Sequence, residues 1–276
     1  MAKKAAEYQN NPFFVALDGL KALFNKASSV GIFLIVLSVL SLGGNAIPAP
    51  TEPTSRSEEL AQRTQFESFF NEMSVSDWVV ISLIGGTILF VLILIGLVIG
   101  GIADYTASKL ASNEGTTLGE AFKEVMKHVA SYLWLSVLIF VKVFLWTLLF
   151  IIPGIYMAIR YSLAGTVFFK EGLRGNAAIK RSLALTKGAW LTTFASHTLW
   201  NVITFGLMDA VLSPGTNGVL YRQYATLTDA NKPKPAAHVL SWLTLILPFV
   251  LVFIFILLFV SLIFALANFT GNFSEV

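Results

Sequence analysis

The chain has 276 residues, of which 55% are hydrophobic and only 13% are charged. Soluble domains carry about 25% charged residues, so the composition excludes a large soluble domain and indicates a membrane protein. Because the chain contains no cysteine, disulfides, thiolate nucleophiles and thiolate metal sites are excluded, and the net charge of +3 is informative mainly through its distribution.

The first part of the chain predicts a surface helix followed by a membrane span. Asn11 and Pro12 are typical of an N-cap and a first helical position, and apolar residues follow at helical spacing up to Phe24. This pattern predicts an amphipathic helix at a membrane surface. The apolar run after it is preceded by a lead that is too long and too amphipathic for a signal peptide, so we expect a first span at residues 30–47.

Residues 48–77 form the longest hydrophilic segment, with a proline-rich loop and then a predicted helix at 57–73. Span 2 is expected at 78–102, where glycines favour close helix contacts. Thr117 and Glu120 then form a predicted capping box, which opens a second amphipathic helix before span 3.

The second half of the chain predicts two helical hairpins and a last span. Span 3 at 133–152 is followed by a turn at Pro153-Gly154, and span 4 covers 155–169. A basic stretch at 170–188 precedes span 5 at 189–212. Pro214-Gly215 then predicts a turn into a polar loop that ends in the sequence KPKP, before span 6 at 239–267.

The fold class that we predict is an all-α integral membrane protein, a single polytopic domain over residues 1–276. It has about six transmembrane helices and three cytoplasmic amphipathic elbow helices, one before each odd-numbered span. Lys and Arg concentrate in the segments that share a side with the N-terminus. The positive-inside rule therefore predicts a cell (inner) membrane protein with both termini in the cytoplasm and the 48–77 segment outside.

Two of the elbow segments share residues at a constant spacing, which indicates up to three repeats of an elbow helix plus a helical hairpin. Four residues recur 56 positions later: Gly119, Ala121, Trp134 and Leu135 match Gly175, Ala177, Trp190 and Leu191. Internal repeats are frequent in transporters, but simple helical bundles also contain them.

Residues 150–191 carry a set of short motifs. They are Pro153-Gly154-Ile155-Tyr156, Arg160-Tyr161-Ser162, Glu171-Gly172 and the stretch from Ala178 to Gly188, AIKRSLALTKG. This set resembles the membrane domain attached to some glycerophosphodiester phosphodiesterases and the YciC-like inner-membrane proteins. The resemblance implies a helical membrane domain and little about mechanism. Because no phosphodiesterase domain accompanies it, that activity is not expected here.

Four polar residues inside the predicted spans are candidates for a polar cavity or a lipid-headgroup site: Arg160, Lys142, Asp209 and His197. Charges inside a membrane usually face the bundle interior or water. The alternatives are a structural Arg160–Asp209 pair or an arginine that snorkels to the interface. His197 and Asn201, one turn apart, fit either a proton relay or an interhelical hydrogen bond.

Lys180, Arg181 and Lys187 fall on one face of the predicted third elbow helix. A basic amphipathic helix attracts anionic headgroups of the inner leaflet, or it enforces topology alone. Both readings place these charges at a membrane, so we expect no nucleic-acid partner.

We therefore expect a non-enzymatic membrane protein that organises the membrane or assembles with copies of itself, with lipids as partners. The alternatives are a transporter or channel for a small or amphiphilic solute, and a membrane subunit of a separate lipid-metabolising enzyme. No residue set is typical of a catalytic site, a metal site or a cofactor site. The three histidines, for example, lie far apart in sequence.

Overall fold

The computed structural model describes residues 8–43, 55–204, 206 and 209–271, and these residues form helices and no strand. The predicted all-helical class is therefore confirmed. The helices are α1 (Pro12–Lys26), α2 (Ser28–Gly43), α3 (Arg56–Glu72), α4 (Val75–Ala111), α5 (Leu118–Lys127), α6 (Val129–Leu149), α7 (Ile151–Tyr161), α8 (Ala164–Glu171), α9 (Gly175–Thr186), α10 (Trp190–Ile203), α11 (Asp209–Asp229) and α12 (Val239–Gly271).

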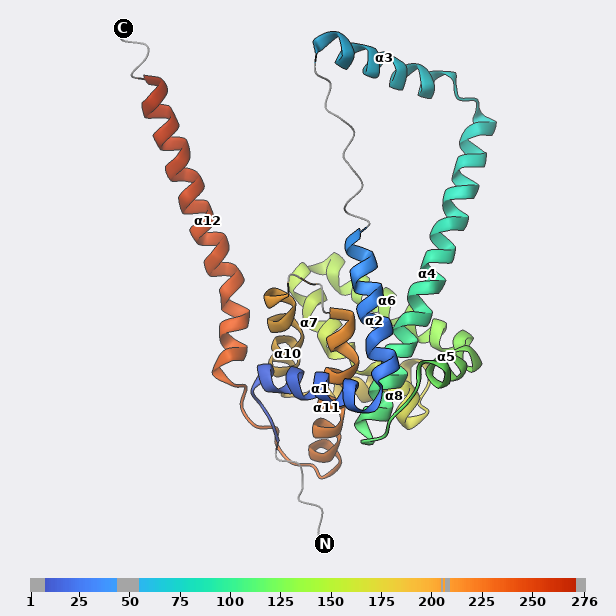
Figure 1. The fold of residues 1–276 in the computed structure, drawn as a ribbon. Helices are drawn as coiled ribbons and strands as arrows, with labels where there is room; N and C mark the ends of the chain where they lie inside the picture. The colour runs from blue at the N-terminus through green and yellow to red at the C-terminus, as the bar shows by residue number, and fades with distance from the viewer. Residues whose placement is uncertain (1–7, 44–54, 205, 207–208, 272–276) are drawn as a thin grey trace.

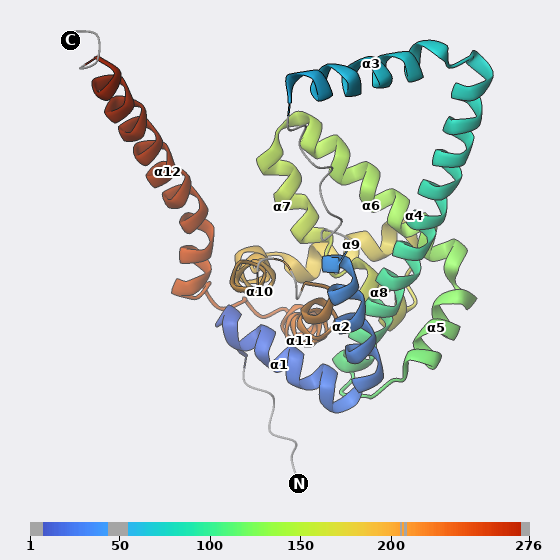
Figure 2. The ribbon, with the colours of Figure 1, turned by 45° about the horizontal axis from the view of Figure 1, so that its top comes forward.

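The helices divide into a packed body and apolar extensions from it (Figure 1). In the body, α11 lies centrally and packs against α1 and α4 (Figure 2). The first half of α4 and nearly all of α12 leave the body on one side, and α3 lies across the far end of α4. The side chains of α4 from Val75 to Ile93 and of α12 from Leu247 to Phe264 are exposed and almost entirely apolar, as expected for surfaces that face lipid.

Four stretches of helix are long and apolar enough to cross a membrane, in agreement with a multi-pass protein. They are Val75–Ala111, Val129–Leu149, Ile151–Glu171 and Val239–Phe264. A fifth is added if α1 and α2, which meet at a bend of 115°, form one broken span. The described helices thus support four or five spans, and the count of six remains a prediction.

The local signals for helix ends were read correctly in several places. Asn11 caps α1, with Pro12 at its first position. Thr117 and Glu120 form both bonds of the capping box of α5. The amphipathic segments do form helices before α2, α6 and α10. Whether they are copies of one repeat remains a proposal.

Two predicted turns were wrong because their prolines lie inside helices. Pro153 is the third residue of α7, in the first turn, where a missing N–H costs no helical bond. The chain turns instead at Phe150, which has an extended backbone. Pro214 lies within α11. Predicted span 5 is also interrupted, because α10 ends at Ile203 and α11 begins at Asp209.

The loop that contains KPKP was predicted outside, opposite the N-terminus, but in the structure it contacts segments that were predicted on the cytoplasmic side. Asp229 Oδ1 lies 2.8 Å from Arg181 Nη2, and Asn10 Nδ2 donates to the Ala236 carbonyl over 3.1 Å. Residues 229–236 therefore lie on the same side of the molecule as the start of α1 and the basic elbow helix α9. Helix α11, which was not predicted, returns the chain to this side of the molecule, and the side of the membrane on which the loop lies remains a prediction.

Candidate polar cavity between α4, α7, α10 and α11

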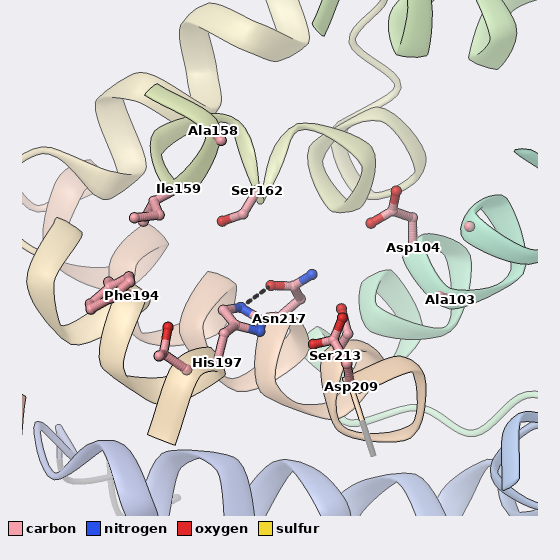
Figure 3. A pocket seen from close by; sticks show the side chains of 12 residues that line it. Ala103, Asp104, Ala158, Ile159, Ser162, Phe194, His197, Asp209, Ser213 and Asn217 are labelled. Atoms are coloured by element: carbon pink, nitrogen blue, oxygen red, sulfur yellow. Dashed lines mark hydrogen bonds between the residues drawn. The ribbon is translucent and has the colours of Figure 1, made fainter. Parts of the chain in front are cut away.

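A cavity of about 420 Å³ lies where four helices of the body meet (Figure 3). Helices α4, α7, α10 and α11 each contribute side chains, and Ser162 comes from the break that separates α7 from α8. The lining residues are Gly100, Ala103, Asp104, Ala158, Ile159, Ser162, Phe194, His197, Thr198, Asp209, Ser213 and Asn217.

Asp104 brings a carboxylate to the wall of the cavity. It lies on α4 below the exposed apolar stretch, where the helix enters the body. The Tyr132 hydroxyl of α6 donates to its Oδ2 over 2.6 Å. Gly165 of α8 lies so close that a Cβ at this position would collide with the carboxylate. Asp104 is therefore held by its neighbours on one side and faces the cavity on the other.

His197 and Asn217 face the same space from α10 and α11 (Figure 3). His197 Nε2 lies 3.1 Å from Asn217 Oδ1. Farther along the same pair of helices, Asn201 Nδ2 donates to Asp209 Oδ1 over 2.8 Å. These contacts are the interhelical hydrogen bonds that we offered for His197 as an alternative to a proton relay.

Ser162 adds a polar group without a partner. Its Oγ is buried and makes no hydrogen bond to any described residue. Figure 3 shows the side chain across the cavity from His197 and Asn217, with its hydroxyl directed away from Asp104. Since buried hydroxyls are normally hydrogen-bonded, a ligand or water in the cavity would be a natural partner.

The lining is rich in oxygen acceptors and contains no Lys or Arg. Such a set suits a solute that donates hydrogen bonds or carries positive charge. The described residues contain no group of three or more His, Asp or Glu placed to hold a metal ion.

The structure separates the four residues predicted from sequence. His197 and Asp209 line the cavity, and Arg160 and Lys142 do not. Arg160 instead donates from Nη2 to the Leu183 carbonyl of α9 over 2.7 Å, with its guanidinium 5.6 Å from the Tyr156 ring centre. Arg160 and Asp209, both in described parts of the chain, form no ion pair. Lys142 lies partly buried on α6.

The motifs of residues 150–191 hold α7, α8 and α9 together through side-chain hydrogen bonds and an ion pair. The Ser182 hydroxyl of α9 donates to the Arg160 carbonyl at the end of α7 over 2.8 Å, and Thr186 reaches the same oxygen over 3.3 Å. Arg181 Nε lies 2.8 and 3.0 Å from the two oxygens of Glu171. Most of the polar residues in the motifs are thereby explained as packing contacts.

Arg181 is accordingly not a free headgroup ligand. Burial favours its neutral form, but the bonds to Glu171 and Asp229 outweigh burial, and the pKa of Arg181 is raised. Lys180 on α9 and Lys187, the residue that follows this helix, are exposed, and their role as a basic face toward the membrane remains a prediction.

Asp104, Asn217, Ser162 and Tyr132 were missed from sequence. Asp104 was left outside span 2, in the polar stretch that follows it, because it lies two residues beyond the predicted end of that span. A usable signal was present: no glycine, proline or asparagine occurs between Asp104 and Ser112, so the helix had no strong reason to end before the aspartate. Asn217 was hidden by its proline- and glycine-rich surroundings.

Comparisons with family models, with curated proteins and with solved structures found no match to this chain.

Proposed function

We propose that this protein is a multi-pass membrane protein that binds a small polar solute in the cavity between α4, α7, α10 and α11, as a transporter or channel. The observation that carries the proposal is the cavity itself, about 420 Å³ with Asp104, His197, Asn217 and Ser162 in its wall. Small-molecule sites typically enclose about 300–1,000 Å³ and place a few polar groups in a largely apolar lining.

The helix breaks beside the cavity support this function. Ser162 lies between α7 and α8, and Asp209 opens α11 after the break that ends α10. Transporters often bind their solute where discontinuous helices meet, because irregular backbone in a membrane protein needs a cavity or protein around it.

The orientation that we propose has the body, with its basic elbow helices, at the cytoplasmic face of the cell membrane. The loop with Lys232 and Lys234 joins that face, and Arg56 and Arg63 lie on α3 at the other end of α4. This distribution follows the positive-inside rule. If α12 crosses the membrane from its start beside Asn10, its last residues lie on the side of α3, so the described ends of the chain lie on opposite sides.

The absence of cysteine allows a direct test with single-cysteine variants. Ser213→Cys places a thiol in the cavity wall, whereas Ser196→Cys places one on α10 at a fully buried position beside His197 but outside the cavity. We expect a water-soluble methanethiosulfonate reagent to modify the first variant in the purified, detergent-solubilised protein and to leave the second unmodified. A Ser213→Cys variant as unreactive as Ser196→Cys would refute a solvent-accessible site.

A second candidate function, self-assembly, is favoured by α12. This helix packs mainly against α10, and its exposed apolar side chains cover it from Leu247 to Phe264. A second copy would bury this surface, and lipid would do so equally well. Native mass spectrometry in increasingly harsh detergents distinguishes a second copy from lipid, because a specific oligomer keeps one stoichiometry.

A further inference from the structure

We infer that the cavity takes a small organic cation, which pairs with the Asp104 carboxylate in exchange for a proton. The inference rests on the proposed function and adds the class of solute and its coupling to protons. It is carried by the charge of the wall: Asp104, Asp209 and His197 line it, and no Lys or Arg does.

The Asp104 carboxylate has room and need for another partner. Its Oδ2 accepts from Tyr132 over 2.6 Å, and no other described side chain bonds to it. A carboxylate taken out of water without a countercharge is costly, so it binds either a proton or a cation. A bound cation therefore displaces the proton instead of adding to it.

The groups around Asp104 supply no permanent positive charge, so the carboxylate pairs either with a proton or with the solute. Tyr132 from α6 donates a neutral hydrogen bond, and α8 contributes Gly165 at the closest approach. His197 from α10 and Asp209 from α11 share the cavity. The nearest arginine along the wall helices, Arg160, is directed to the carbonyl of Leu183 on α9.

The acidic groups of α5 and both charged groups of α8 are paired elsewhere. Glu120 bonds to Thr117 at the start of α5, and Glu124 pairs with His128 over 3.1 Å. On α8, Lys170 bonds to Ser112, and Glu171 pairs with Arg181. None of these side chains lines the cavity.

The remaining wall matches an ammonium group. Ser162 Oγ and the Ser213 hydroxyl offer acceptors for N–H groups, and Phe194 supplies an aromatic ring that attracts a cation. In the exchange, the O–H bond of the Asp104 carboxylic acid breaks and its proton passes to water, while the ammonium ion keeps its own protons and forms an ion pair with the carboxylate. Charge in the cavity is thus unchanged by loading.

The test measures proton release on cation binding. Ethylammonium chloride is added to the full-length purified protein in weakly buffered detergent between pH 5 and 8, and a pH indicator reports the protons released. We expect up to one proton per bound cation, with ethanol and sodium chloride releasing none. Asp104→Asn should abolish release and weaken binding at least tenfold, whereas Asp77→Asn, at the far end of the same helix, should leave both unchanged.

A second measurement keeps the inference testable if Asp104→Asn does not fold. In the Ser213→Cys variant, ethylammonium should slow thiol modification at least fivefold, and ethanol should not. Equal protection by ethanol, or protection by ethylammonium without proton release, would overturn the inference and leave a solute cavity intact. A Ser213→Cys thiol that is never modified would instead overturn the proposed function.

Discussion

Gly165 sets the distance between α8 and the Asp104 carboxylate. Asp104 lies against this glycine through its Oδ2, the oxygen that also accepts a hydrogen bond from Tyr132. A side chain at position 165 would push the carboxylate away from the tyrosine hydroxyl. The cavity wall thus depends on a residue that does not line it.

Gly165→Ala should therefore destabilise the protein by about 1–3 kcal/mol, the usual range for an added methyl group in a packed interior. The measurement is thermal unfolding in detergent. Gly119→Ala is the matched control, because a Cβ at Gly119 in α5 meets nothing within 4 Å. It should be neutral or stabilising by up to about 1 kcal/mol. Equal effects of the two substitutions would contradict the close approach.

Glu120 links the stability of α5 to pH. The Thr117 backbone N–H donates to its carboxylate over 2.9 Å, and this bond, with one from the Thr116 hydroxyl, lowers the pKa of Glu120. A carboxyl whose pKa is lower in the folded state stabilises the fold above its unfolded pKa of about 4.3, and this stabilisation is lost as pH falls through the folded pKa.

The difference in melting temperature between wild type and Glu120→Ala should accordingly be constant above about pH 5.5 and shrink as the pH falls below about 4. Thermal unfolding at steps between pH 3.5 and 7 measures it. A difference that grows on acidification would show that the carboxylate does not act as the cap in solution.

At the scale of elements, α1 crosses α11 where two glycines meet. A Cβ added at Gly19 would lie 2.5 Å from the backbone nitrogen of Thr216, and one added at Gly215 would collide with the backbone of Gly19. The adjoining Gly218 approaches the Ala107 carbonyl of α4 in the same way. The sequence around Pro214 therefore has a turn-like composition because three helices pack closely there.

Gly215→Ala should cost more than Gly165→Ala, because the obstacle is backbone and α1 must shift as a whole. We expect a loss of at least about 3 kcal/mol or a failure to fold, measured as melting temperature and as yield of monodisperse protein. Gly85→Ala on α4 is the control, since a Cβ there meets nothing within 4 Å. A Gly215→Ala protein as stable as wild type would argue against the crossing.

Features that depend on residues close together in the sequence were predictable, whereas features that depend on contacts between distant residues were not. Local signals such as the Thr117 capping box and the long apolar runs were sufficient for helices and for the membrane class. The course of α11 was not predictable, because its glycines are explained only by α1 and α4, which lie far away in sequence. Of the candidate site, His197 and Asp209 were identified, whereas Asp104, Ser162 and Asn217 were missed.

At the scale of the whole molecule, helix α11, which was not predicted, is compatible with a membrane topology other than the six-span one. The six-span prediction placed both termini on one side, with the loop of Lys234 opposite. In the structure this loop contacts the start of α1 through the Asn10–Ala236 bond, and α12 then extends 33 residues away from it. At 1.5 Å per residue, α12 is about 50 Å long, which exceeds a hydrocarbon core of about 30 Å.

Single cysteines at three positions decide between the topologies. Thr64 lies on α3, Lys234 in the loop before α12, and Thr270 in the last turn of α12. In sealed vesicles of known orientation, a membrane-impermeant maleimide should label Thr64→Cys and Thr270→Cys from one side and Lys234→Cys only from the other. Labelling of Lys234→Cys and Thr64→Cys from one side, with Thr270→Cys opposite, would restore the six-span arrangement. It would also place the α10–α11 break at a membrane surface, where a polar cavity needs no solute to explain it.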